Sequence, residues 1–438
     1  MLQTLNGIVW GTPGLVLLLG SGLYLTAKTG FVQFRLLLPS IRAFFQQLHN
    51  TESGSFRPLC TALAATVGTG NIAGVAGAIA LGGPGSVFWM WISGFVGMAT
   101  KFTEASLAVR YSKNRIGGPM YIMERGLGHK WRPMAWLYCG LGIVASLGVG
   151  NAAQINAVVS AVWTAGEQLG IILDRKLLVI LGVILAVTVW SMVSGGASKI
   201  GEVAEFLVPF ASVLYMLICG MVLILRFDYW DDALRLIVSS AFTPEGVTGG
   251  AVGSGLTALR YGISRGVFSN EAGMGTAAIA HAGAQVEYPA QQGMMGIVEV
   301  FLDTIVMCTM TAMVILVSGV PIPYGMDAGA ELTAKALSQV LGSWVGILLS
   351  MCLGCFAFAT ILGWGLYAGR CFEYLLGKLN WTVFALFQAG AVFWGTVADT
   401  GAIWSFSELF NGLMALPNLL ALLLLGKQAR EISLDYLK

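Results

Sequence analysis

The stretch LAATVGTGNIAGVAGAIALGG, residues 63–83, decides how this chain folds. It carries no charge and is as long as the run of about 20 apolar residues that a helix needs to cross a bilayer. Gly68, Gly70 and Asn71 nevertheless stand in its middle, and a glycine in a helix interior costs about 1 kcal/mol relative to alanine. The sequence therefore predicts a helix that enters a membrane and is interrupted there.

The composition of the whole chain is typical of an all-α polytopic membrane protein. Of its 438 residues, 56% are hydrophobic and only 11% are charged, whereas soluble proteins carry about 25% charged residues. The net charge of +2 offers no basic face for nucleic acid, and three histidines are too few for a metal cluster. The seven cysteines fall mostly in apolar runs and are interpreted as packing residues. Cys352 and Cys355 form a lone C-x-x-C pair, for which a redox or metal role is the lesser alternative.

Apolar runs of about 20 residues predict eleven spans. The first run is counted because its first basic residue, Lys28, follows the apolar residues, whereas a secretory signal begins with positive charge. The predicted spans lie near residues 7–26, 58–81, 85–109, 133–164, 177–194, 200–225, 256–280, 292–318, 343–374, 381–397 and 404–425.

Lysine and arginine are distributed unevenly between these spans. Sixteen lie on the side that holds residue 28, five lie on the other side, and Lys101, Arg260 and Arg265 fall inside spans, which accounts for all 24. Because Lys and Arg favour cytoplasmic loops, we expect the N-terminus outside and the C-terminus inside.

The interrupted second span has a counterpart in the seventh span. There the stretch YGISRGVFSNEAGMGTAAIA, residues 261–280, contains Gly262, Gly266, Ser269, Asn270, Glu271, Gly273 and Gly275. The two interrupted spans are five helices apart. Because five is odd, a second block of five helices that begins at the seventh span would enter the membrane from the side opposite to the first block. The predicted division is an extra helix and connector (1–57), a first repeat (58–225), an outer linker (226–255), an inverted second repeat (256–425) and an inner tail (426–438). Glycine-broken spans at matching positions of two halves are the sequence sign of a transporter's binding site.

Interrupted helices can bind ligands because unwinding frees backbone groups that lipid cannot satisfy. Oxygen atoms near Thr66, Thr69 and Asn71 suit an alkali or alkaline-earth cation, and amides at a half-helix N-terminus can bind a carboxylate. The alternative is close packing through Gly70 and Gly74 without any ligand. The matching break at Asn270 favours the binding site.

Isolated polar and aromatic residues give weaker signals. Gln154 is a candidate contact to a polar substrate, with interhelical hydrogen bonding as the alternative. Thr360 and Trp364 are four residues apart and share a helix face, so Thr360 could complete a cation site and Trp364 could wall a small pocket. Phe268 is a second candidate for the pocket wall. Core packing is the alternative for both aromatic residues.

Acidic residues inside spans are costly and usually functional. For Glu271 we expect an ion pair with Arg265, with a proton carrier as the alternative. Glu299 and Asp303 lie one helical turn apart, which suits a shared cavity face or a proton relay. We expect a pair between Lys101 and Glu104 at an inner helix end. Glu202 and Glu205 are expected at the membrane interface.

Five strings of residues resemble one known family. They are ALAATVGTGNIAGVAGAIALGGPGSVFWMW (62–91), KFTEASLAVRYS (101–112), GGPMYIMERGLG (117–128), SRGVFSNEAGMGTAAIAHA (264–282) and FATILGWGLYAGR (358–370). The resemblance is to the alanine or glycine:cation symporter family, the sodium:alanine symporters, within the amino acid-polyamine-organocation superfamily. It covers residues from about 7 to 425.

The resemblance implies a leucine-transporter-type five-plus-five inverted repeat with one extra N-terminal helix, in the plasma membrane of the cell. It implies uptake of alanine or glycine driven by sodium, with no other cofactor. The implied substrate contacts are Thr69, Gly70, Asn71, Gln154, Phe268, Ser269, Asn270 and Trp364. The implied sodium ligands are Thr66, Val67, Thr69, Asn71, Asn270, Ala359 and Thr360.

Two other functions are kept as alternatives. Transport could be coupled to protons through Glu271 or through Glu299 and Asp303, in which case it would survive replacement of sodium by choline. A channel or a sensor is disfavoured by the inverted repeat and by an inner tail of only about 13 residues. No nucleophile-and-base motif or metal-ligand set points to an enzyme.

Overall fold

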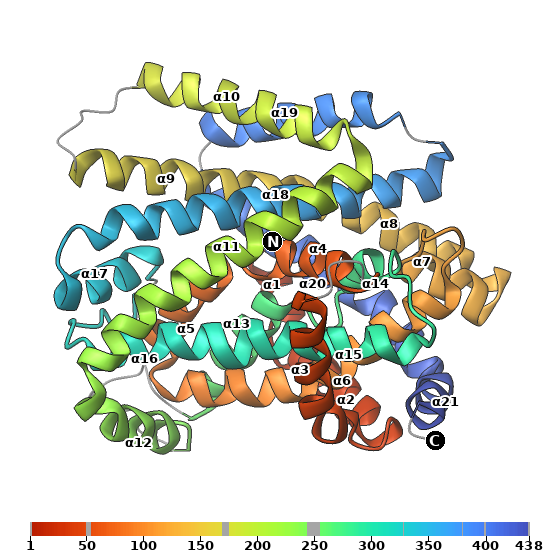
Figure 1. Ribbon diagram of the computed structural model, residues 1–438, viewed down its shortest axis with the longest axis horizontal. Helices are drawn as coiled ribbons and strands as arrows, with labels where there is room; N and C mark the ends of the chain where they lie inside the picture. The colour runs from red at the N-terminus through yellow and green to blue at the C-terminus, as the bar shows by residue number, and fades with distance from the viewer. Residues whose placement is uncertain are drawn as a thin grey trace.

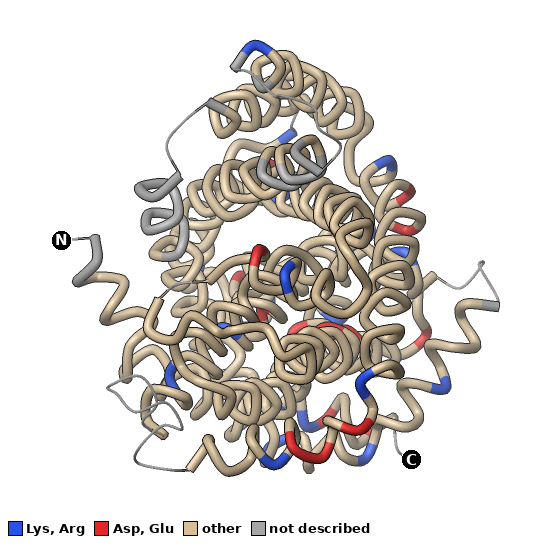
Figure 2. The backbone as a smooth tube through the Cα atoms, turned by 90° about the vertical axis from the view of Figure 1, so that its left-hand side faces the viewer, with Lys and Arg blue, Asp and Glu red and all other residues tan. Residues whose placement is uncertain are grey.

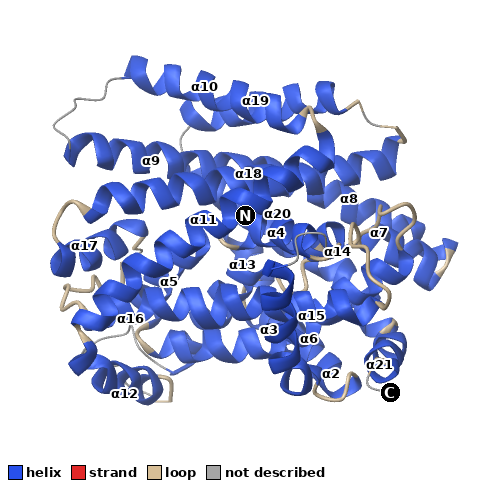
Figure 3. Cartoon of the chain, in the orientation of Figure 1, coloured by secondary structure: helices blue, strands red, loops and turns tan. Residues whose placement is uncertain are grey.

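The computed structural model describes residues 2–49, 54–168, 175–242, 255–326, 328–378, 380–397 and 400–436. Within these ranges the secondary structure is helical and contains no β-strand (Figure 3). Residues 243–254, which belong to the predicted outer linker (226–255), lie outside the described residues.

The first half of the chain forms α-helices interrupted by short π and 3₁₀ turns, which carry η labels. These are α1 (Leu2–Val9), α2 (Thr12–Lys28), α3 (Val32–His49), α4 (Phe56–Thr66), η1 (Gly70–Gly74), α5 (Val75–Gly82), α6 (Gly85–Tyr111), α7 (Pro119–Tyr121), η2 (Ile122–Leu127), η3 (His129–Trp131), α8 (Arg132–Leu147), η4 (Gly148–Ala152), α9 (Ala153–Gln168), α10 (Arg175–Val193) and α11 (Gly196–Leu225).

The second half repeats this pattern of long helices with interruptions. It comprises η5 (Phe227–Tyr229), α12 (Trp230–Ser240), α13 (Gly255–Asn270), α14 (Thr276–His281), α15 (Pro289–Val300), η6 (Phe301–Cys308), α16 (Thr309–Val317), α17 (Ala330–Leu341), α18 (Val345–Leu376), α19 (Trp381–Val397), α20 (Thr400–Leu424) and α21 (Gly426–Asp435).

Every predicted span coincides with a helix or with a run of helices. Among the described residues, five helices are long and apolar enough to cross a membrane, and two bent helix pairs raise this number to seven. The other four predicted spans are occupied by α6, by α10, by α13 with α14, and by α19. The total of eleven spans and their orientation stay predictions.

Helices α3, α12 and α17 lie between the predicted spans. They are only 18, 11 and 12 residues long and are amphipathic. In α12, for example, Ala233, Ile237 and Ser240 are buried, a spacing of three to four residues that places them on one face. A search for long apolar runs does not detect such helices.

Both predicted helix interruptions are confirmed. In the first, α4 ends at Thr66 and Val67 is extended (φ −76°, ψ 106°). The span bends by 51° between its two halves. In the second, α13 ends at Asn270 and α14 begins at Thr276, with Gly273 and Gly275 at φ +93° and +83° between them. Left-handed backbone of this kind favours glycine because it has no Cβ.

The helices form layers, with the breaks at the centre of the molecule (Figure 1). Helix α10 packs against α19 at the top of that view, and α9 packs against α18 below them. Towards the bottom, α6 packs against both α13 and α15. Long stretches of the backbone carry no charge, but acidic residues lie inside the helical assembly as well as at its margin (Figure 2). The interior therefore combines an apolar core with a few buried ionisable groups.

Candidate functional site

Asn71 connects the first break to two other helices. Its side-chain Oδ1 accepts a hydrogen bond from the N–H of Gly68 at 2.8 Å, so it satisfies a backbone group that the break has freed. Its Nδ2 donates to Oδ1 of Asp303 at 2.7 Å and to Oγ of Ser269 at 3.1 Å. Asn71 is completely buried. The first broken span is thereby joined to α13 and η6.

Asn270 makes the corresponding hydrogen bonds at the second break. Its Oδ1 accepts from the N–H of Ala272 at 3.0 Å, and its Nδ2 donates to Oγ1 of Thr304 at 3.0 Å. A Cβ on Gly70 would lie 3.5 Å from Cα of Ser269, so the two broken segments pass within van der Waals contact of each other. The predicted residues Gly70, Asn71, Ser269 and Asn270 therefore lie together.

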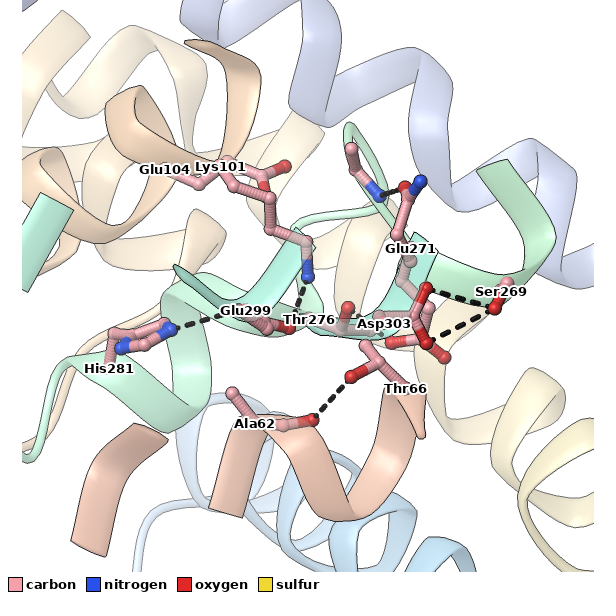
Figure 4. A network of polar contacts seen from close by, with 12 residues as sticks. Ala62, Thr66, Lys101, Glu104, Ser269, Glu271, Thr276, His281, Glu299 and Asp303 are labelled. Atoms are coloured by element: carbon pink, nitrogen blue, oxygen red, sulfur yellow. Dashed lines mark hydrogen bonds and ion pairs between the residues drawn. The ribbon is translucent and has the colours of Figure 1, made fainter. Parts of the chain in front are cut away.

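Asp303 is the centre of this junction (Figure 4). It is fully buried, and it accepts hydrogen bonds from Asn71, from Ser269 at 2.9 Å and from Thr304 at 2.9 Å. In the described part of the chain, no Lys, Arg or His makes an ion pair with it. A buried carboxylate without a cationic partner is costly. Oxygen atoms of this kind suit a hard cation.

Thr69 and Gln154 meet beside the first break. The hydroxyl of Thr69 donates to Oε1 of Gln154 at 3.2 Å, and Nε2 of Gln154 donates to the carbonyl of Val149 at 3.2 Å. Gln154 thus bridges the broken span to η4. The structure brings both predicted residues to the same junction.

Trp364 is buried and packs against η4. A Cβ on Gly150 would lie 2.3 Å from Cβ of Trp364, so glycine is what allows this contact. The ring of Trp364 lies 5.7 Å from that of Tyr367, and the indole N–H has no hydrogen-bond partner among the described residues. Phe268 is half-buried and packs edge-on against Trp10, which follows α1, with ring centroids 6.5 Å apart.

The second group of predicted cation ligands lies between α4 and α18. Thr66 donates its hydroxyl to the carbonyl of Ala62 at 3.2 Å, and Thr360 donates to that of Phe356 at 3.0 Å. A Cβ on Gly68 would lie 3.0 Å from Oγ1 of Thr360. Thr360 therefore faces the break that begins at Val67, with Ala359 beside it, and the oxygen lone pairs of both hydroxyls stay available.

The predicted pair between Lys101 and Glu104 is wrong. Nζ of Lys101 lies 2.7 Å from Oε1 of Glu299, and both side chains are completely buried. Glu104 instead accepts from the N–H of Gly275 at 3.0 Å and from Nδ2 of Asn418 at 2.6 Å. Spacing along α6 could not reveal this partner, because the close approach of α15 decides which face of α6 meets a carboxylate.

The predicted pair between Arg265 and Glu271 is also wrong. Glu271 has left-handed backbone (φ +54°) and its Oε2 accepts a hydrogen bond from Thr276 at 2.6 Å. The guanidinium of Arg265 lies 5.9 Å from the ring centre of Phe268. The two residues are six positions apart, a spacing that does not place them on one helix face, and Glu271 follows the end of α13.

Two further pairs of acidic residues, Glu299 with Asp303 and Glu202 with Glu205, differ in their surroundings. Glu299 and Asp303 belong to separate hydrogen-bonded groups, and no hydrogen bond joins one carboxylate to the other in the described structure. Glu202 and Glu205 make ion pairs with Arg57 at 3.7 and 2.9 Å, and their place at the membrane interface stays a prediction.

The sequence suggests a shared cavity face or a proton relay for Asp303, but it places neither Asp303 nor Thr304 among the binding residues. An acid inside a span was the available signal, but its partners come from helices that are distant in sequence. Four helices also contain π turns, which often occur at functional sites. Three of these turns, η1, η4 and η6, surround this junction.

No cluster of three or more His, Cys, Asp or Glu suited to a metal occurs in the described residues. The junction instead offers hydroxyl, amide, carbonyl and single carboxylate oxygens. Two broken membrane helices that meet at such a junction define a class of secondary transporter. The solved structure of MhsT in complex with L-phenylalanine has this fold, with a TM-score of 0.61 and 14% identity, covering 86% of this chain and 97% of that one.

The chain belongs to the sodium:alanine symporter family, whose family model matches residues 1–438. It is 39% identical to the sodium/alanine symporter AgcS of Methanococcus maripaludis, over 97% of this chain and 94% of that protein. It is 36% identical to the probable sodium/glutamine symporter GlnT of Bacillus subtilis, over 98% of this chain and 89% of that protein. The predicted family membership is confirmed, and it indicates a transporter rather than an enzyme.

Proposed function

We propose that this protein is a sodium-coupled symporter that takes up small neutral amino acids, alanine and glycine, across the plasma membrane. The observation that carries this proposal is the junction of Asn71, Ser269 and Asp303, where two broken helices and η6 share hydrogen bonds. The relative AgcS is named a sodium/alanine symporter, which supports sodium as the coupling ion and alanine as a substrate.

Sodium would bind in two places. At the junction, oxygen atoms of Thr69, Asn71 and Asn270 would hold one ion, and the uncompensated carboxylate of Asp303 would balance its charge. Between α4 and α18, the hydroxyls of Thr66 and Thr360 and the carbonyls of Val67 and Ala359 would hold another ion. Each ion would replace its hydration shell with oxygen ligands that the helix breaks have freed.

The amino acid would bind beside the first ion. Backbone amides at Thr69 and Gly70, near the start of a half-helix, would hold the carboxylate. Gln154, Phe268, Ser269 and Trp364 would enclose the ammonium group and the side chain. The tight contact between Gly150 and Trp364 supports a small pocket, since it holds the indole against η4.

Alternating access would follow from the proposed five-plus-five repeat. Helices at matching positions of the two proposed halves pack against one another: α6 with α15, α9 with α18, and α10 with α19. This pairing supports an axis that relates the halves, and it supports the proposed boundaries at residues 57, 225, 255 and 425. The two broken spans with α6 and α15 would then move as a bundle against the other helices, with the N-terminus outside and the C-terminus inside.

The test is uptake of radiolabelled alanine into proteoliposomes with an inward sodium gradient and equal pH on both sides. We expect accumulation that is lost when choline replaces sodium and lost in Asn71→Ala. Asn380→Ala is the matched control, because Asn380 is exposed and caps α19 away from the junction. Accumulation that persists in choline would contradict sodium coupling.

Proton coupling is the second candidate because Asp303 and Glu271 are buried and no lysine or arginine forms an ion pair with them in the described structure. An inward proton gradient without sodium would then drive uptake. Loss of that uptake in Asp303→Asn or Glu271→Gln would assign the carrier.

A further inference from the structure

A second buried polar group lies outside the junction, at the C-terminal end of α14. Nε2 of His281 lies 3.0 Å from Oε2 of Glu299, whose Oε1 pairs with Lys101 at 2.7 Å (Figure 4). The other ring nitrogen, Nδ1, lies 2.6 Å from Nε2 of Gln292. All four side chains are completely buried. We call these four residues the His281 cluster.

The hydrogen bonds fix the charge state of the ring in this arrangement. Nε2 of Gln292 is a donor, so Nδ1 of His281 must accept, and the single ring proton must sit on the nitrogen that faces Glu299. His281 is then neutral. The same arrangement leaves Oε1 of Gln292 buried without a hydrogen-bond partner in the described structure.

Half a turn of the Gln292 amide gives the cluster a second state. It would place Oε1 against Nδ1, and this oxygen can accept only if Nδ1 carries a proton. The ring would then be a cation held between the carboxylate of Glu299 and the amide oxygen of Gln292. The same four side chains therefore accommodate both charge states of His281 with one amide rotation.

The ionisable groups that face the cluster are Lys101 and Glu104 of α6, Glu299 of α15, Glu271 in the second break, Asp303 of η6 and Tyr367 of α18. From α4 and α7 the side chains that pack with α14 are apolar, namely Ala62, Ala65 and Met120. These groups are four carboxyl groups, one lysine and one tyrosine, so a cationic ring would lie among more acidic than basic side chains.

Water comes close to the cluster from one side. A cavity of about 430 Å³ is lined by Gln285, Gln291 and Met295, among others, so it reaches the same turn of α15 that carries Gln292. The backbone N–H of Gln285 also donates to the carbonyl of Gly54 at 3.1 Å, and both loops lie on the predicted inner side. The cavity therefore reaches the residue next to Gln292 from the predicted inner side.

We propose that His281 is the binding site of a regulatory proton from the inner side, which Gln292 accommodates by turning its amide. α14 is the inner half of the second broken span, and its other end is held where Glu104 accepts from Gly275. A protonated ring adds an ion pair between α14 and α15, so it holds this half-helix in place and slows opening to the inside. This consequence rests on the proposed transport function, whereas the protonation itself does not.

Ring-nitrogen NMR tests the protonation directly. The chain has only three histidines, so the signals of reconstituted protein labelled with ¹⁵N-histidine can be assigned by their loss in His281→Gln. In spectra recorded from about pH 5 to about pH 8, we expect two forms of the ring, one protonated on Nε2 alone and one protonated on both nitrogens. A ring that keeps one neutral tautomer over this range would overturn the proposal.

Uptake measured at equal pH on both sides tests the consequence, since no proton gradient can then drive transport. We expect the initial rate to fall several-fold from pH 8 to pH 6 and to be nearly constant in His281→Gln. His129→Gln is the matched control, because that side chain is 87% exposed. An unchanged pH profile in His281→Gln, after normalisation to its own maximum, would overturn the regulatory role.

Two substitutions of Gln292 give an independent check if His281→Gln does not fold. Gln292→Glu supplies a charged acceptor to Nδ1 and should move the midpoint of the pH profile upwards by about one unit, whereas Gln292→Leu removes the acceptor and should move it downwards. Equal midpoints in both variants would contradict the proposal. If uptake is absent altogether, the proposed function fails, and the NMR experiment still decides whether His281 binds the proton.

Discussion

Asn71 and Asn270 each satisfy a backbone group at the adjacent helix break with a side-chain hydrogen bond. In both residues the oxygen accepts from a freed backbone N–H, and the nitrogen donates to a residue of η6. An asparagine can do this because its amide carries an acceptor and two donors at one end. A leucine at either position would leave the backbone group unsatisfied.

Asp303→Asn tests the carboxylate at the junction. The change keeps the shape of the side chain and removes its charge. Asn would no longer balance the charge of a bound cation, so we expect affinity for sodium to fall by about ten- to a hundredfold, which corresponds to about 1.4 to 2.8 kcal/mol. The sodium concentration that gives half-maximal alanine uptake measures this.

Asp231→Asn is the control for this experiment, because Asp231 pairs with Arg235 at an exposed site. The same sodium dependence in Asp303→Asn as in the unaltered protein would remove Asp303 from the cation site.

Lys101→Met tests the buried ion pair of the His281 cluster. It would leave Glu299 without its lysine, and breaking a buried pair from one side costs about 3 to 5 kcal/mol. We expect a clear drop in the thermal unfolding midpoint of the purified protein, and we expect Lys101→Met combined with Glu299→Gln to recover most of it.

Arg235→Met, which breaks the exposed pair, should leave the unfolding midpoint nearly unchanged. A single Lys101→Met variant as stable as the unaltered protein would show that Glu299 does not depend on this lysine.

At the scale of elements, glycines set how closely the broken helices approach their neighbours. Gly70 meets Ser269, Gly68 meets Thr360, and Gly150 meets Trp364. The last contact is the tightest, and it involves the Cβ of the tryptophan, which cannot move without the backbone of α18. η4 is therefore held at a distance from α18 that only glycine permits.

Gly150→Ala should separate η4 from α18. The added methyl would lie 2.3 Å from the side chain of Trp364, and such overpacking typically costs about 1 to 3 kcal/mol. We expect a lower unfolding midpoint and reduced alanine uptake. Gly140→Ala in α8 is the control, because its added methyl meets nothing within 4 Å. Equal behaviour of the two variants would mean that this contact does not position Trp364.

The positions of the long helices and of both breaks could be predicted from the sequence because apolar length and interior glycines are local signals. The meeting of the segments that carry Asn71 and Ser269 could be predicted because the two breaks repeat one pattern. The partner of Lys101 could not be predicted from the sequence, since it depends on how α6 is rotated towards α15. The hydrogen bonds of Asp303 with Asn71 and Ser269 could not be predicted either, because they come from two segments distant in sequence.

At the scale of the whole molecule, the two broken spans share one hydrogen-bonded junction, so an ion that orders one break also orders the other. In the proposed mechanism, sodium binds first and raises the affinity for the amino acid. Thermodynamic linkage requires the reverse effect to be equal. The amino acid must then raise the affinity for sodium by the same factor.

The most direct measurement of this coupling is equilibrium binding of radiolabelled alanine to the purified protein at several sodium concentrations, with choline keeping the ionic strength constant. We predict that sodium strengthens alanine binding by a factor in the usual range of about 5 to 150, that alanine strengthens sodium binding equally, and that Asn71→Ala loses both effects. Alanine affinity that is the same in sodium and in choline would contradict the account.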